Sequence, residues 1–200
     1  MEENERIRLL EAKTLQLGAF RAKVIEVSNV ETDASFRDMC ASNACGMYGA
    51  CWTCPPDIGQ IDVLMEQLRE YSHVLVYQTV GQLEDSYDFE GMMDAGKNHN
   101  RIAQSLRSVV ADAGISDPLH LGAGGCRVCP VCAKRTGEAC RHPDLCMSSL
   151  EAYGIHVSRL AVKAVSLGAM NEEQREVVYS ALDVISKNLQ KAVEEGLPQE

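Results

Sequence analysis

Nine cysteines stand out in this chain of 200 residues, because thiolates are soft ligands that bind zinc and the iron of iron–sulfur clusters. Eight of them fall into two groups, each confined to a short stretch of sequence. The first group is Cys40, Cys45, Cys51 and Cys54, and the second is Cys126, Cys129, Cys132 and Cys140. Both groups are predicted to bind metal. Cys146 follows the second group and is left out of the predicted ligands. It could be a fifth, exchangeable thiolate, and a spare buried cysteine is the favoured interpretation.

The second group has the spacing C-x2-C-x2-C-x7-C, and its first three cysteines open like the run of a bacterial ferredoxin. A loop with this spacing can wrap one compact centre, which Cys140 closes from the far end. The segment Gly122–Gly125 precedes Cys126 and lets the backbone approach a bulky cluster closely. The expected cofactor is a [4Fe–4S] cluster held by Cys126, Cys129, Cys132 and Cys140, and zinc is the alternative.

The first group is less regular, with the spacing C-x4-C-x5-C-x2-C followed by two prolines. It begins like the plant-type iron–sulfur spacing and then departs from it. Cys45, Cys51 and Cys54, with Cys40 remote, would suit a centre that keeps one coordination position open for a substrate. Tyr48 would then be the nearest proton donor.

Disulfide bonds are the competing use of so many cysteines, and they belong to oxidising compartments. The chain begins MEENERIRLL, which lacks the apolar core of a secretory signal. An odd number of cysteines also fits poorly with a closed disulfide framework. We therefore expect free thiolates in a reducing cytoplasm.

The composition is that of a globular protein, with 46% hydrophobic and 24% charged residues, and no apolar stretch is long enough to span a bilayer. A formal net charge of −10 and an aromatic content of 5% argue against nucleic acid as a partner, because its phosphates would be repelled. An acidic surface suits a basic redox partner protein. Neither nucleic acid nor a membrane is expected as a partner, and the oligomeric state stays open.

The periodicity of apolar residues predicts a single α/β or α+β domain over residues 1–200, with a small sheet and flanking helices. Helices are expected at 5–17, 33–37, 62–71, 87–113, 148–152 and 171–195, and strands at 20–30, 73–80 and 119–121; the segment 154–165 fits either. The two cysteine loops, at 40–59 and 122–147, should then lie on the same side of the domain. They form either two sites or one shared site.

Two segments, CGMYGACWTCPPDIG and CRVCPVCAKRTGEACRHPDLCMSSLEAYGIHV, resemble a family of prokaryotic predicted metal-binding proteins of unknown function that is common in anaerobes. The shared motifs are CG-x-YG-x-x-W-x-CPP and C-x2-C-x2-C…CR-x-P…S-x-EA-x-GI. The resemblance implies that the following cysteines are metal ligands: Cys45, Cys51, Cys54, Cys126, Cys129, Cys132 and Cys140. Cys40 is added to this set as a further ligand. It names no reaction.

Three functions compete on these grounds. The first is a cytoplasmic iron–sulfur protein that passes electrons, or has an accessory redox role, in anaerobic metabolism. The second is a zinc-stabilised binding module, and the third is a metalloenzyme with an open coordination position. The sequence does not decide whether the protein is an enzyme.

Overall fold

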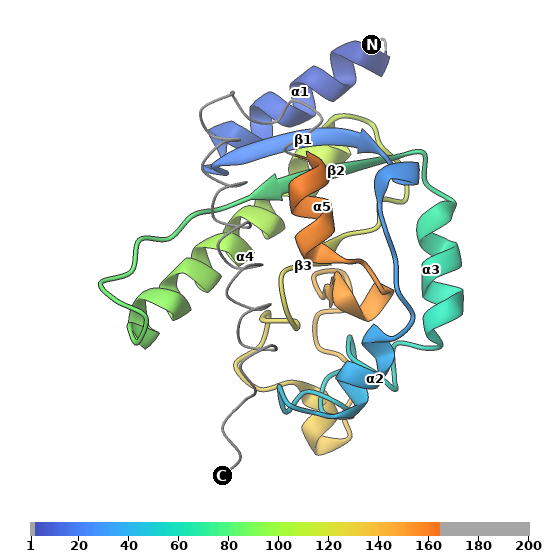
Figure 1. Cartoon of the computed structure of the whole chain (residues 1–200), viewed down its shortest axis with the longest axis vertical. Coiled ribbons are helices and arrows are strands. Elements are labelled where there is room, and N and C mark those ends of the chain that lie inside the picture. Colours follow the sequence, from blue (N-terminus) through green and yellow to red (C-terminus); the bar gives the residue numbers. More distant parts are fainter. Residues whose placement is uncertain (1–2, 165–200) are drawn as a thin grey trace, which may run out of the picture.

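The computed structural model describes residues 3–164, which form a mixed α/β structure consistent with one small domain, as the sequence predicts (Figure 1). The helices are α1 (Glu3–Gln16), α2 (Phe36–Ala41), α3 (Ile61–Arg69), α4 (Phe89–Asp112) and α5 (Val157–Ala164). The strands are β1 (Arg21–Glu26), β2 (His73–Gln78), β3 (Leu121–Gly122) and β4 (Ser148–Ser149). Short 3₁₀ turns lie at Val27–Asn29, Ala133–Thr136 and Glu151–Tyr153.

Strands β1 and β2 form an antiparallel pair, in which Arg21 lies opposite Gln78 and Glu26 lies opposite His73. Two apolar clusters anchor the helices around this pair. One joins β1 to α3 and α5, and its buried members are Ile25, Leu64, Leu68, Tyr153, Ile155 and Leu160. The other lies between α1 and α4, and its buried members are Leu10, Val110 and Ala113. These clusters place the helices by burying apolar surface, which is the main force for folding.

The short strands β3 and β4 are parallel, with Leu121 opposite Ser148 and Gly122 opposite Ser149. They lie just before Cys126 and just after Cys146, so their pairing closes the neck of the second cysteine loop. The predicted helix at 148–152 is wrong at its start, because Ser148 and Ser149 pair with β3 and only a 3₁₀ turn follows. The side chain of Ser149 accepts the backbone N–H of Ala152 at 3.1 Å and so begins that turn.

Most other predicted elements are confirmed with shifted ends. The helix expected at 33–37 begins at Phe36 instead, because Asp33 accepts the N–H of Ser35 in a turn before it. This helix runs to Ala41 and therefore contains Cys40. Helix α4 ends before Gly114, whose φ of 70° is the left-handed geometry typical of a helix end. The segment 154–165, for which the sequence allowed a helix or a strand, contains helix α5. The predicted helix at 171–195 lies outside the described residues.

No helix among residues 3–164 is both long enough and apolar enough to cross a lipid bilayer.

Candidate metal centre

The two cysteine loops meet at one end of the molecule. Figure 1 shows α2, at the start of the first loop, beside the second loop and away from β1 and β2. The indole N–H of Trp52, in the first loop, donates to the carbonyl oxygen of Glu138 in the second loop at 2.9 Å. The ammonium of Lys134 lies 4.1 Å from the centroid of the Trp52 ring and forms an ion pair with Asp57. The prediction that both loops lie on the same side is therefore confirmed.

A small cavity lies between the two loops, and we call it the thiol cavity. Its volume is about 20 Å³, enough for a body the size of one water molecule. One cysteine of the first loop and several of the second line it: Cys51, Cys126, Cys129, Cys132, Cys140 and Cys146. The predicted ligands of the second group thus face one space together, and Cys146 joins them.

Local hydrogen bonds fold the first loop so that two of its cysteines turn inward. Asn43 has a φ of 56°, and its side-chain oxygen accepts the backbone N–H of Tyr48 at 3.0 Å. Cys51 and Cys54 are only 1% and 9% exposed. The thiol of Cys51 lies 3.3 Å from the hydroxyl oxygen of Thr53. Tyr48 itself is an exposed residue of this loop, with 36% of its surface accessible.

The four cysteines of the first group are close enough to influence one another. Burial, with smaller contributions from Cys51, Cys45 and Cys40, raises the pKa of Cys54 to about 12. Burial also raises the pKa of Cys40, which lies in α2, and the neighbouring Cys45 adds to that rise. Cys45 is exposed. Cys54 is therefore held as a neutral thiol unless a cation takes the place of its proton.

Cys51 connects the two groups of thiols. It interacts with Cys54 in its own loop and with Cys132 in the second loop. Gly125 brings the loops together at another point, because a Cβ atom on it would lie 3.8 Å from the sulfur of Cys54. The sequence left open whether the groups are separate, and in the structure they are contiguous.

The surroundings of Cys132 favour its thiolate form. Burial alone would raise the pKa of Cys132, but neighbouring groups outweigh it and the pKa is lowered. These groups are the backbone amides of Lys134 and Trp52, the thiol of Cys51 and the guanidinium of Arg141. Amide donors and a cation stabilise negative charge on sulfur, and the thiolate is the form that binds metal.

A family model described as predicted metal-binding protein (DUF2284) matches residues 23–182, which include both cysteine loops. The chain belongs to this family. Comparisons with curated proteins and with solved structures find no significant match. Membership of the DUF2284 family indicates metal binding, and it specifies neither the metal nor a reaction.

The chemistry of the thiol cavity fits the function that the DUF2284 family description gives. Sulfur donors select zinc, copper(I) and the iron of iron–sulfur clusters. As the side chains stand, residues 3–164 contain no group of three or more histidine, cysteine, aspartate or glutamate side chains arranged to hold a metal ion. Metal binding would therefore require the thiols to move, and each cysteine side chain can do so by rotation about its single side-chain torsion. The fit therefore rests on the type of donor and on the cavity that the donors share.

Cys146 also lines this cavity, although reasoning from the sequence weighed it as a fifth thiolate and left it out of the predicted ligands. Its thiol donates to the carbonyl oxygen of Pro143 at 3.1 Å and also interacts with the thiol of Cys140. The backbone N–H groups of Leu145 and Cys146 both donate to the carbonyl oxygen of His142, at 3.1 and 3.0 Å. The sequence signal was the His-Pro-Asp run after Cys140, because proline and aspartate favour a turn that returns the chain.

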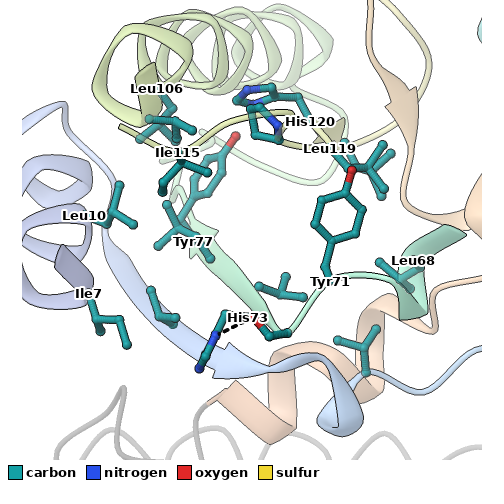
Figure 2. A pocket seen from close by; sticks show the side chains of 18 of the residues that line it. Ile7, Leu10, Leu68, Tyr71, His73, Tyr77, Leu106, Ile115, Leu119 and His120 are labelled. Carbon is teal, nitrogen blue, oxygen red and sulfur yellow. Dashed lines mark hydrogen bonds between the residues drawn. The ribbon is translucent and has the colours of Figure 1, made fainter. Parts of the chain in front are cut away.

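A larger cavity, of about 370 Å³, lies between the β1–β2 pair and residues 115–121 (Figure 2). Aliphatic side chains from α1 and α4 form much of its wall: Leu10, Leu106 and Val110. Burial raises the pKa of Tyr77 to about 12. Burial also lowers the pKa of His120, and the nearby positive charge of Arg107 lowers it further. No cysteine among residues 3–164 lines this cavity.

Proposed function

We propose that this protein is a cytoplasmic iron–sulfur protein that exchanges electrons with a partner protein. The observation that supports the proposal is the convergence of thiols from two loops on one cavity. A structural zinc ion takes four protein ligands, whereas the thiol cavity alone is lined by more cysteines than that. A surplus of contiguous thiols suits an iron–sulfur cluster, or two neighbouring centres, better than one zinc ion.

The second loop would hold a [4Fe–4S] cluster through Cys126, Cys129, Cys132 and Cys140. The first group would hold a second centre through Cys40, Cys45, Cys51 and Cys54, with Cys51 at the boundary. When bound, such clusters supply one-electron chemistry. The chain contributes the environment: the backbone amides near Cys132 and the Arg141 cation stabilise negative charge on the ligands.

The partner would be a protein with a basic docking surface. The chain carries a formal net charge of −10, and charge complementarity raises the rate of encounter between proteins. We expect neither nucleic acid nor a membrane to be the partner, because the same charge repels phosphate groups. Association with a basic electron carrier should weaken as salt is added, since screening removes long-range attraction.

Anaerobic purification tests the function directly. The expected product is brown and contains iron with a matching amount of acid-labile sulfide, about eight irons per chain if two [4Fe–4S] clusters are present. Reduction should bleach the visible absorbance and give an electron paramagnetic resonance signal. A colourless protein that holds stoichiometric zinc and lacks sulfide would contradict the proposal.

A zinc-stabilised binding module is the second candidate, and the size of the thiol cavity favours it. A volume of about 20 Å³ is closer to one metal ion than to a cluster. A structural zinc site would fold the loops and perform no redox chemistry. In that case a chelator should unfold both cysteine loops, whereas exposure to air should leave the metal content unchanged.

A further inference from the structure

The pairing of β3 with β4 fixes both ends of the second cysteine loop. Gly122 lies opposite Ser149, so the chain leaves the ladder toward Cys126 and returns to it from Cys146. Close packing reinforces the neck, because a Cβ atom on Gly122 would lie 3.8 Å from the Cβ atom of Met147. Cys146 is therefore placed at the thiol cavity by the same ladder that places Cys126.

Helix α4 holds the turn that carries Cys146. The guanidinium of Arg107 donates to the carbonyl oxygens of Asp144, Leu145 and Cys146, at 2.7, 3.1 and 3.1 Å. The side-chain amide of Gln104 donates to the carbonyl oxygen of Leu145 at 2.9 Å. A planar guanidinium that binds successive carbonyl groups fixes their orientation, which a single point charge does not. Side chains of α4 thus fix the position of the turn that contains Cys146.

Cys140 and Cys146 bring two neighbouring thiols to the same side of the thiol cavity. Both line it, and Cys140 lies near enough to contribute, after burial, to the raised pKa of Cys146. The thiol of Cys146 donates to the carbonyl oxygen of Pro143 at 3.1 Å, a bond that only the protonated form makes.

We propose that Cys140 and Cys146 share one ligand position of the centre, which either sulfur can fill. The inference rests on the proposed metal function, and it adds a ligand that neither the motif spacing nor the DUF2284 match assigns. The exchange moves no electrons. The sulfur that binds releases its proton, and the sulfur that leaves takes one up, so the charge of the centre is unchanged.

Four variants test the shared position: Cys140→Ser, Cys146→Ser, the double variant, and Cys129→Ser as the matched control without a neighbouring spare thiol. Each is purified anaerobically and analysed for iron, zinc and acid-labile sulfide. Each single change at the shared position should keep most of the wild-type metal, because the other sulfur takes over. The double variant should lose as much metal as Cys129→Ser.

Two results would overturn the shared position while the wild type still binds metal. In one, Cys140→Ser alone loses as much metal as the double variant. In the other, the double variant keeps the wild-type content. A wild-type protein that binds no metal would overturn the proposed function and this inference together. Circular dichroism of the metal-free variants separates loss of ligand from loss of fold.

A readout that needs no metal tests the neighbourhood of the two thiols. Dibromobimane joins thiols that lie side by side, and trypsin cuts between them at Arg141, so a cross-link connects peptides 136–141 and 142–159. Mass spectrometry of the metal-free wild type should find this linked pair, and both single variants should lack it. A cross-link that instead joins Cys140 only to another cysteine would contradict the proposal.

Discussion

The indole of Trp52 and the carbonyl oxygen of Glu138 form a hydrogen bond of 2.9 Å that ties the first cysteine loop to the second. The same ring carries the ammonium of Lys134 over its face. One aromatic side chain therefore joins the loops by a directional bond and by a cation–π contact. Trp52 and its neighbours in sequence, Cys51 and Thr53, all line the thiol cavity.

Replacing this indole tests the junction. Trp52→Phe keeps an aromatic face and removes the N–H donor, so we expect a loss of about 1 kcal/mol in the free energy of unfolding. Bound metal should also pass to a chelator faster than in the wild type. Tyr71→Phe is the matched control, because it removes a hydrogen bond to the carbonyl oxygen of Asp117, and neither residue belongs to a cysteine loop. Equal rates of metal release from both variants would show that the indole does not hold the loops closed.

The metal content of Cys129→Ala distinguishes one centre from two. Two independent centres predict that this change removes about half of the bound metal, since only the second loop loses a ligand. A single centre shared by both loops predicts the loss of nearly all of it. Cys146→Ala should leave the content unchanged, and equal losses from both changes would show that the ligands are wrongly assigned.

The amphipathic pattern in the sequence was enough to predict α4, whose Ile102, Leu106 and Val110 face the core at helical spacing. The pattern failed at Ser148 and Ser149, because their partners in β3 lie far away in sequence and short strands carry little periodicity of their own. The spacing of the cysteines indicated one site within the second loop. It gave no information on Cys51 bridging the two groups, since that contact depends on how the loops fold against each other.

Two glycines with left-handed backbone geometry should respond differently to alanine. Gly154 has a φ of 73°, and an added Cβ would lie 3.1 Å from the side chain of Met65 and 3.2 Å from the carbonyl oxygen of Asp33. Gly114 has a φ of 70° and open space around it. Gly114→Ala should cost about 1 kcal/mol from backbone strain alone, and Gly154→Ala about 2–3 kcal/mol, because crowding is added. Urea unfolding measures both, and equal costs would show that the contacts near Gly154 yield freely.

Acid should destabilise the fold partly through His120. Burial lowers its pKa in the folded state, so below about pH 6.5 the unfolded chain binds a proton that the folded chain does not. The contribution of His120 to the free energy of unfolding should therefore fall as the pH drops through that value. His120→Gln should flatten this part of the stability curve relative to the wild type, as followed by urea unfolding at several pH values. His73→Gln, at an exposed histidine, is the control. An unchanged curve in His120→Gln would contradict the prediction.

The guanidinium of Arg107 should keep the Cys146 turn closed against α4. Arg107→Met retains much of the aliphatic length and removes the donors to three carbonyl oxygens, so we expect about 1–3 kcal/mol lower stability. In the metal-free variant, iodoacetamide should modify Cys146 faster than in the wild type, because the turn opens more often. Arg101→Met is the matched control, since Arg101 lies on the same helix and donates instead to the carbonyl oxygen of Leu17. If Cys146 reacts at the same rate in both variants, the His142–Cys146 turn holds its shape without help from α4.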